Sequence, residues 1–386
     1  MSADFGVRTA GAAGTGPGEA GPAAGELTEP TTGARWCLGT RLLVALTVAW
    51  GMFLLLQYAL SGRLWLWLVP DLVPPLAFVA VPLALLAAAY FARPVRRTLI
   101  PLLAATTALG AVYSGLNPYA VANWNAQAPP RDALRVMSWN TQYWHQWDDP
   151  DRFYRYLKAQ RADVYLLQEY LSWVGERPVR TDDMARLRRE FPGYEVAVSG
   201  ELLTLSRFPI VGRPAIGPAR AIRPTTEWTR VYESAKVLRT DLRIKGTVMS
   251  FYNVHIPVQV DAARNPLTPG FYRTVRQRDA ERRPQFAALE KDVAGNDRPL
   301  LVAGDFNTSP AMGDIGGLEG VLRDAVRKSP ALYPATWRDQ GPGLWRLDWA
   351  FTSDQVAVHR YDLRGSAGMS DHRAQELRLS LEGGAR

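Results

Sequence analysis

Residues 300–310 read Leu-Leu-Val-Ala-Gly-Asp-Phe-Asn-Thr-Ser-Pro, and the rest of the chain is interpreted outward from this stretch. Its apolar first half, bounded by turn residues, is typical of a short buried strand. The strand delivers Asp305 and Asn307 into the following loop, and side chains two residues apart on an extended backbone point the same way. A carboxylate beside a carboxamide suits a water, a hard cation or a phosphoryl oxygen, and α/β sheets bind ligands beyond their strand ends. The alternative is a turn whose Asx side chains merely cap the strand.

Composition limits the class of protein. The 386 residues suffice for one large domain or two smaller ones. The net charge of +8 fits an anionic partner such as phosphate, nucleic acid or a membrane surface, and it equally fits a membrane protein with basic loops. Cys37 is the only cysteine, which excludes a disulfide framework and a cysteine-based zinc site and suits an oxidising compartment.

The first third of the chain predicts a membrane anchor. Residues 1–34 are rich in Gly, Ala, Pro and Thr, so we expect a disordered cytoplasmic tail. Three apolar runs follow at about residues 42–60, 72–92 and 99–116, each near the length that crosses roughly 30 Å of hydrocarbon. The sequence therefore predicts an anchor over residues 35–116 with three transmembrane helices. Buried helices of a soluble domain are the alternative.

Positive charges near these runs predict the orientation, because Lys and Arg favour the cytoplasmic side. They gather at one end of the runs: Arg35, Arg41, Arg93, Arg96 and Arg97. Three crossings then leave everything after residue 116 outside the cytoplasm, in a multi-pass protein of the cell membrane. Residues 117–132 contain Pro118, Pro129 and Pro130 and are expected to form an extended, semi-rigid linker.

The remaining residues, 133–386, alternate between strand and helix patterns. Helices are expected over residues 151–160, 181–190 with Thr181 as N-cap, and about 275–294, where Pro284 should split or kink the helix. Strands are expected over residues 134–139, 163–168, 194–198, 202–205, 236–242, 247–254, 300–305, 347–352 and 375–379. Many strands with few helices between them predict an α/β domain built of packed mixed sheets.

Polar side chains recur where these strands end. The set comprises Asn140, Gln168 and Glu169, Asn253 and His255, Asp305 and Asn307, Asp348, and Ser370, Asp371 and His372. Singly, each has an ordinary structural explanation as a turn, surface or core residue. Together, Glu169, Asp371 and Asn140 offer oxygen ligands for a hard cation such as Mg²⁺, with Mn²⁺ as the alternative.

The other members suggest hydrolytic chemistry. His372 beside a carboxylate suits a general base or a charged clamp on phosphate, and Asp348 is the candidate that holds this histidine in one tautomer. Asp305 and Asn307 are placed to position an attacking water. His255 is the candidate to protonate the leaving oxygen or to stabilise charge on phosphorus.

The order of these motifs resembles the endonuclease/exonuclease/phosphatase superfamily, which includes DNase I-like nucleases and phosphatases. The resemblance covers about residues 133–382 and is carried most specifically by Gly-Asp-Phe-Asn (304–307) and Ser-Asp-His (370–372). It implies a four-layer α/β sandwich, one or two divalent ions and in-line attack of water on phosphorus. It also implies that Glu169 binds metal near Asn140 and Asp371, and that Asp305, Asn307, His255 and the Asp348–His372 pair are catalytic. The segment from Ser206 to Ile210, which contains Arg207, also resembles the family, but a strand-to-turn junction explains it as well.

The substrate stays open between hypotheses. A domain tethered to a bilayer meets lipid phosphates at high effective concentration. The layout resembles membrane-anchored actinobacterial members of the superfamily linked to glycopeptide (teicoplanin) resistance, which implies a polyprenyl pyrophosphate substrate at the outer face. The alternatives are a tethered nuclease acting on DNA or RNA, and a non-enzymatic binding protein. A basic cluster would serve a nucleic-acid groove, an anionic lipid patch or a solvated helix face: Arg264, Arg273, Arg276, Arg278, Arg282 and Arg283. No protein partner is inferred.

Overall fold

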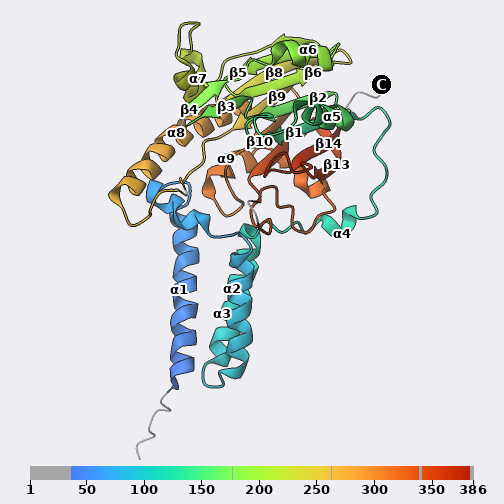
Figure 1. Ribbon diagram of the computed structural model, residues 1–386. Helices are drawn as coiled ribbons and strands as arrows, with labels where there is room; N and C mark the ends of the chain where they lie inside the picture. Colours follow the sequence, from blue (N-terminus) through green and yellow to red (C-terminus); the bar gives the residue numbers. More distant parts are fainter. Residues whose placement is uncertain (1–35, 176, 262, 339–340, 383–386) are drawn as a thin grey trace, which may run out of the picture.

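The computed structural model describes residues 36–175, 177–261, 263–338 and 341–382. The predicted tail over residues 1–34 lies outside the described residues. The chain forms a head of strands and helices above a stalk of three helices (Figure 1).

Two six-stranded mixed sheets form the head. The first has the order β13 (Val356–Arg364), β14 (Ala374–Leu381), β1 (Leu134–Asn140), β2 (Val164–Gln168), β6 (Leu202–Ser206) and β5 (Glu195–Ser199). The second has the order β11 (Arg323–Asp324), β12 (Asp348–Thr352), β10 (Leu300–Asp305), β9 (Thr247–His255), β8 (Val237–Ile244) and β7 (Ile210–Gly212). A separate hairpin pairs β3 (Leu171–Val174) with β4 (Arg177–Arg180). Among the described strands, β1 pairs with β2 and β9 pairs with β10 in parallel and the other pairs are antiparallel, so both sheets are mixed.

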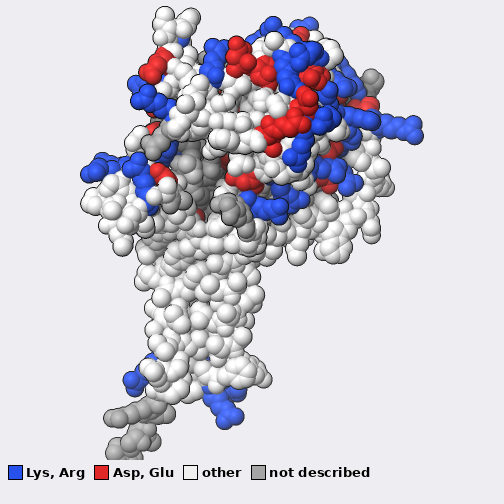
Figure 2. All heavy atoms as spheres, viewed as in Figure 1, with Lys and Arg blue, Asp and Glu red and all other residues white. Residues whose placement is uncertain are grey.

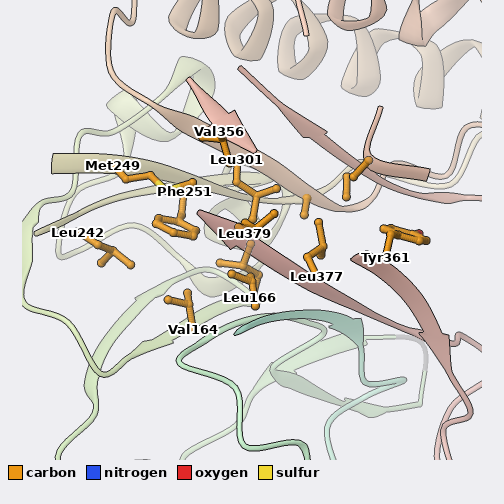
Figure 3. Close-up of a cluster of buried hydrophobic side chains, with 14 of the residues drawn as sticks. Val164, Leu166, Leu242, Met249, Phe251, Leu301, Val356, Tyr361, Leu377 and Leu379 are labelled. Atoms are coloured by element: carbon orange, nitrogen blue, oxygen red, sulfur yellow. The ribbon is translucent and has the colours of Figure 1, made fainter. Parts of the chain in front are cut away.

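The sheets pack face to face over one apolar core and carry helices on their outer faces. Phe251 and Leu301 of the second sheet meet Leu166 and Leu377 of the first in that core (Figure 3). Helices α5 (Pro150–Gln160) and α6 (Met184–Glu190) cover the other face of the first sheet, and α8 (Pro269–Ala294) and α9 (Gly316–Glu319) cover that of the second. The predicted α/β class of packed mixed sheets flanked by helices is confirmed.

The remaining elements of the head are short. They are α7 (Trp228–Ser234), η3 (Gly217–Ala221), η4 (Gly313–Ile315) and η5 (Ala325–Lys328). Strand β13 was not predicted, because its nine residues mix charged and apolar side chains and most of them are only half-buried. The short strands β3, β4, β7 and β11 were missed as well.

Two helix predictions need correction. Thr181 is not the N-cap of α6: the helix begins at Met184 after Asp183, and the Thr181 hydroxyl bonds instead with Ser172. The Asp183 carboxylate, directly before the helix, accepts hydrogen bonds from Trp144 and Tyr154. Helix α8 runs unbroken through Pro284, because one lost backbone donor is offset by burial of its apolar face against β9 and β10.

Gly304 explains why the central strand carries a glycine directly before Asp305. Its φ is +152°, and a Cβ built there would lie 1.9 Å from the carbonyl oxygen of Val254 on β9. Any side chain at this position would push β10 away from β9. Glycine therefore lets the strand that carries Asp305 lie against the strand that carries His255.

The stalk consists of α1 (Leu38–Leu60), α2 (Ala77–Phe91) and α3 (Arg96–Tyr113), with η1 (Trp65–Leu68) and η2 (Pro70–Leu72) joining α1 to α2. Near the far tip, Leu43 of α1 packs with Ala89 of α2 and Leu103 of α3. Near the head, Leu54 packs with Phe78. The stalk is therefore a packed bundle, with α2 and α3 forming a hairpin beside α1 (Figure 1).

The prediction of three transmembrane helices is not confirmed. Among the described residues, α1 alone is long and apolar enough to cross a membrane, or two spans qualify if Trp65–Leu72 and Ala77–Phe91, bent by 60°, count as one. The Pro74-Pro75 pair ends the helical path of the second apolar run, so α2 has 15 residues and is only about 22 Å long. Helix α3 begins with Arg96 and Arg97, which reduce its apolar length.

The predicted extended linker over residues 117–132 contains a helical turn, α4 (Ala120–Asn123), and is attached to the head. The Asn117 side chain is buried and donates to the carbonyl oxygens of Val326 and Ser329 at 3.0 and 2.9 Å. The Trp124 indole donates to Pro330. The chain leaving the stalk is therefore fixed to the head from its first residues.

Candidate active site

The register of the second sheet places three predicted catalytic residues in one row. Asp305 at the end of β10 lies opposite His255 on the parallel strand β9 and opposite Asp348 on the antiparallel strand β12. Gly304 permits this close approach. All three side chains are nearly inaccessible to solvent. Adjacent strand ends thus gather two carboxylates and an imidazole within a protected site.

The first sheet contributes Asn140, which connects the two halves of the site. Its amide nitrogen donates to Glu169 Oε1 and to Asp305 Oδ2, both at 3.0 Å. Its carbonyl oxygen accepts the backbone N–H of Gln142 at 3.0 Å. In this geometry the amide nitrogen, not the oxygen, faces the carboxylates, so Asn140 positions two acidic side chains that come from different sheets.

His372 and Asp348 form the predicted pair. His372 Nδ1 lies 2.8 Å from Asp348 Oδ2, and His372 Nε2 lies 3.5 Å from Asp305 Oδ2. Burial by itself lowers the pKa of His372, but the carboxylates of Asp348 and Asp305 raise it to about 10. Asp348 therefore both orients the imidazole and favours its charged form, leaving Nε2 directed into the site.

His255 has an equivalent partner that the sequence analysis missed. Its Nδ1 lies 3.1 Å from Glu201 Oε2, while its Nε2 faces Asp305 Oδ2 at 3.6 Å. Glu201 also pairs with Lys236, and both of these side chains are buried. Burial raises the pKa of Glu201, but His255 and Lys236 lower it to about 2, so the carboxylate is ionised. The available signal was an acid directly before the strand that begins Leu202-Leu203, which a surface turn explains equally well.

Asn307 holds the loop that carries it against the site. Its backbone N–H donates to Asp305 Oδ1 at 2.8 Å, and its side-chain amide donates to the carbonyl of Ile256 at 2.9 Å. A longer contact of 3.4 Å joins this amide to Asp305 Oδ2. The Asp305 carboxylate therefore accepts hydrogen bonds from both Asn140 and Asn307, and these bonds fix its orientation.

Glu169 and Asp371 lie on opposite sides of this row. Glu169 Oε2 accepts the backbone N–H of Tyr143 at 2.9 Å, and its Oε1 lies 3.9 Å from His255 Nε2. Asp371 Oδ2 accepts the Trp337 indole N–H at 2.8 Å, and its Oδ1 lies 4.0 Å from His372 Nε2. Trp337 was not anticipated, because an aromatic in a loop gives no sequence signal for holding an acid.

Backbone strain gathers around these side chains. Gln142, Tyr143, Trp144, Glu169 and Asn307 all adopt positive φ values between 46° and 67° without being glycine. Such conformations are costly for residues with a Cβ and persist only where surrounding contacts impose them. Their concentration in the loops after β1, β2 and β10 marks this edge of the two sheets as a functional site.

The donor set fits a divalent cation. Acidic groups outnumber basic ones at this site, where two histidines and one lysine face five carboxylates: Glu169, Glu201, Asp305, Asp348 and Asp371. Burial raises the pKa values of Glu169 and Asp305, which a nearby cation would oppose. Glu169 and Asp371 would hold the ion, and the ion would supply charge neutralisation for a bound phosphate. The predicted ligand Asn140 does not join them in this orientation, because its amide nitrogen faces Glu169 and Asp305 and its oxygen accepts from Gln142.

A second acidic grouping also has ligand geometry. Among the His, Cys, Asp and Glu side chains of the described residues, one group of three brings its ligand atoms within 4.8 Å of one another: Asp305, Asp348 and His372. The sequence analysis assigned these residues to catalysis, and the hydrogen bond between Asp348 and His372 agrees with that role.

Several predicted residues lie elsewhere. Arg207 is directed away from the site, with its guanidinium 3.5 Å from Asp163 and bonded to Tyr194, so the strand-to-turn interpretation holds. Gln168 and Asn253 are buried behind the row, where the Gln168 amide donates to Asn253 Oδ1 at 2.6 Å. That bond links the two sheets and has no access to a ligand.

The predicted basic cluster is not one surface. Arg282 is fully buried and donates to the carbonyl oxygens of Pro257 and Asn307 and to the Thr308 hydroxyl. It therefore holds together the loops that follow β9 and β10. Arg278 and Arg283 form ion pairs within α8, with Glu281 and Asp279.

Comparison with known proteins identifies the fold. The sequence profile of the endonuclease/exonuclease/phosphatase family matches residues 122–372, which is more than half of the chain. The chain belongs to this family. Its members are phosphoester hydrolases that typically use a divalent metal, and the cluster around Asp305 matches that chemistry. No curated protein matches the sequence.

Several solved structures are similar to this chain at low identity. An endonuclease/exonuclease/phosphatase from Bacteroides vulgatus has 18% identity and a TM-score of 0.44, and the match covers 65% of this chain and 100% of that one. A mannosyl-6-phosphatase from Bacteroides thetaiotaomicron has 17% identity and a TM-score of 0.42, covering 64% and 100%. The human Nocturnin catalytic domain with bound sulfate has 17% identity and a TM-score of 0.41, covering 66% and 96%.

Proposed function

We propose that this chain is a membrane-anchored, divalent-metal-dependent phosphoesterase that hydrolyses a phosphoester or phosphoanhydride of a membrane lipid. Our preferred substrate is a polyprenyl pyrophosphate at the outer face of the membrane, which would connect the activity to glycopeptide resistance. The preferred ion is Mg²⁺, with Mn²⁺ as the alternative. Family membership supports the reaction class, and the position of the site relative to the stalk supports the lipid.

One observation carries the choice of a lipid. The loop that leaves Asp305 rests directly on the end of the stalk: Gln57, in the last turn of α1, donates from Nε2 to the carbonyl oxygen of Ala311 at 2.6 Å. Two residues further on, the Gly313 N–H donates to Ser61 Oγ at 2.8 Å. Ala311 also packs with Leu54 and Phe78 of the stalk. A freely diffusing substrate gives no reason to fix a catalytic loop to the end of an apolar helix.

The surface of the stalk supports a membrane location. On the face shown in Figure 2 it carries no Lys, Arg, Asp or Glu between its far tip and the head. The exposed basic residues of the tip are Arg41, Arg93, Arg96 and Arg97. We infer that α1 crosses the bilayer with this tip in the cytoplasm, that the α2–α3 hairpin lies beside it, and that the head is extracytoplasmic.

The side chains of the site suit in-line hydrolysis. Asp305, fixed by Asn140 and Asn307, would orient a water toward phosphorus and accept its proton. A bond forms from the water oxygen to phosphorus as the bond to the leaving oxygen breaks, and the leaving oxygen takes a proton from a histidine. Burial lowers the pKa values of His255 and His372, but the surrounding carboxylates raise both of them above the ordinary value. Both histidines direct their Nε2 atoms to the same side as Asp305, which suits stabilisation of the phosphoryl charge and protonation of the leaving oxygen. A bound divalent ion would add charge neutralisation.

The tethered nuclease gains little support. A nucleic-acid groove needs a continuous basic surface for phosphates. In α8, Arg282 is buried, and Arg278 and Arg283 are paired with acids of the same helix. The basic residues left exposed, Arg273 and Arg276, lie toward the stalk end of α8 rather than along a groove.

The test offers the full-length protein, in detergent with Mg²⁺, undecaprenyl pyrophosphate and plasmid DNA in parallel. We expect phosphate release from the lipid, intact DNA and no activity in His372→Ala. Tyr58→Leu, a change of an exposed stalk residue, is the matched control and should keep full activity. Nicked DNA with unchanged lipid would replace the proposal with a nuclease, and activity unchanged in His372→Ala would refute the assigned site.

A further inference from the structure

The underside of the head, where the stalk enters it, exposes large apolar side chains on two separate segments and on one residue beside the second of them. Leu267 and Tyr272 belong to the segment that begins α8, and Leu267 is 91% exposed. Tyr119, Val121 and Trp124 surround α4, and Leu332 lies beside them; Val121 and Trp124 are each 65% exposed. We call these six residues the seating surface.

Both segments are fixed to the ends of stalk helices. Phe271 and Val275 of α8 pack against Leu68 of η1, four residues after the turn that ends α1. Asn117, four residues beyond the end of α3, donates its backbone N–H to the carbonyl of Leu332 at 2.8 Å. Figure 1 shows the beginning of α8 and the short helix α4 on opposite sides of the stalk, near the level where it meets the head.

The kinds of residue distinguish this surface from the rest of the head. Apart from Trp147, the large apolar side chains exposed on the described head outside these segments are all valines. Single exposed valines are ordinary on a protein surface, whereas Trp, Tyr and Leu together are typical of a bilayer interface. Their gathering at the stalk end of the head therefore calls for a covering partner.

Charge indicates what that partner is. The exposed charged residues within residues 263–276 and 325–333 are all basic: Arg264, Arg273, Arg276, Arg327 and Lys328. Residues 117–128 contain no charged residue. Apolar and aromatic side chains bordered by Arg and Lys match an anionic lipid surface, where the chains enter the interface and the cations meet the head groups.

We propose that the seating surface rests in the interface of the same bilayer that holds the stalk, against anionic phospholipid. This inference rests on the membrane location in the proposed function. The head is then held at three places, by α1 and by a segment on each side of it, so it does not pivot on the stalk. The catalytic loop fixed to Gln57 consequently stays at one height above the bilayer, and substrate phosphates are accepted only at that height.

The experiment uses full-length protein carrying Cys37→Ser, with single cysteines labelled by a small environment-sensitive fluorophore. Leu267→Cys and Val121→Cys report on the seating surface. Val174→Cys, on the β3–β4 hairpin, is the matched control, because it is 68% exposed and lies away from the stalk. Leu46→Cys, within α1 and 56% exposed, reports insertion. The protein is placed in nanodiscs of phosphatidylcholine, with or without phosphatidylglycerol, containing lipids that carry a shallow nitroxide.

We expect labels at positions 267 and 121 to be quenched several-fold more than the label at 174, and the quenching to increase with phosphatidylglycerol. The double variant Arg273→Glu/Arg276→Glu should remove that increase at position 267. The control Arg188→Glu/Arg189→Glu, on the exposed side of α6, should keep it.

Quenching at 267 and 121 no stronger than at 174, with strong quenching at 46, would overturn this inference and leave the anchor intact. Absence of quenching at 46 as well would overturn the membrane location itself. Shielding of 267 and 121 from aqueous iodide without lipid quenching, dependent on the number of protein copies per disc, would assign the surface to a second copy of the chain instead.

Discussion

Gln57 Nε2 lies 2.6 Å from the carbonyl oxygen of Ala311, and this hydrogen bond joins the last turn of the stalk helix α1 to the loop that begins at Asp305. The same nitrogen donates to Asp71 at 2.6 Å, and the Gln57 carbonyl oxygen accepts the Trp67 indole N–H at 2.7 Å. This buried amide therefore joins α1 to the η1–η2 connection and to the catalytic loop.

Gln57→Leu should lower kcat more than it changes KM. Leucine leaves the Ala311 carbonyl buried without a donor, so the loop carrying Asn307 shifts, and misplacement of reacting groups by about 1 Å costs up to about a hundredfold in rate. Steady-state kinetics on the lipid substrate in detergent measures the split, with Tyr58→Leu as control. Unchanged kcat in Gln57→Leu would mean that the stalk does not position the loop.

Asp348→Asn should lower kcat by about a hundred- to ten-thousand-fold, the range of a general acid–base contribution. The amide cannot favour the charged imidazole, and it lets His372 adopt the other tautomer. Kinetics should be compared with Asp354→Asn, which changes an aspartate whose side chain is 72% exposed. Equal activity in the two variants would remove Asp348 from the site.

Gly304→Ala should destabilise the head by about 3 kcal/mol, because it combines a strained φ with overpacking against Val254. Thermal unfolding of the protein in detergent measures the loss. Gly365→Ala is the control, since nothing lies within 4 Å of a Cβ built there. A melting temperature within error of wild type in Gly304→Ala would show that β9 and β10 lie further apart than described.

The pair of Glu201 and Lys236 should contribute a specific acid sensitivity. The pKa of Glu201 is lowered from 4.5 to about 2, so its stabilising contribution is complete above pH 4.5 and is lost as the pH falls toward 2. Over that window wild type should lose more thermal stability than Glu201→Gln/Lys236→Met, which removes both charges together. Melting temperatures of both proteins are measured from pH 5 to pH 3. An equal fall of melting temperature with pH in the two proteins would contradict an ionised Glu201.

Removal of divalent ions should abolish hydrolysis, and Mg²⁺ should restore it. Binding to the folded state alone also raises thermal stability, by about 2.7 kcal/mol at a ligand concentration of one hundred times Kd. Glu169→Gln should lose most of this Mg²⁺-dependent rise in melting temperature, whereas Glu195→Gln, at the start of β5, should keep it. An undiminished rise in Glu169→Gln would move the ion to other ligands, with the Asp305, Asp348 and His372 group first among them.

Sequence patterns predicted the core strands, because short apolar runs bounded by turn residues usually form buried strands in an α/β domain. They also predicted which polar residues end those strands, and Asp305, Asn307, His255, Asp348 and His372 do meet at one edge. Edge strand β13 was not predicted, because charged residues mask its alternating pattern. Helix α8 continues through Pro284, because tertiary packing outweighs the local loss of one backbone hydrogen bond. The length of α2 was overestimated, since the apolar run includes the Pro74-Pro75 turn.

The sequence by itself determined the family, the α/β class and the identity of most site residues, because these depend on local periodicity and on the order of short motifs. Only the tertiary structure decided which other side chains contact these site residues and the loops that carry them. Glu201 pairs with both His255 and Lys236, and Trp337 donates to Asp371. Arg282 of α8 joins two loops, and Gln57 joins the stalk to the catalytic loop. Each of these contacts joins residues far apart in the chain or on different elements, and local pattern contains no information about which distant side chains sheet register and helix packing bring together.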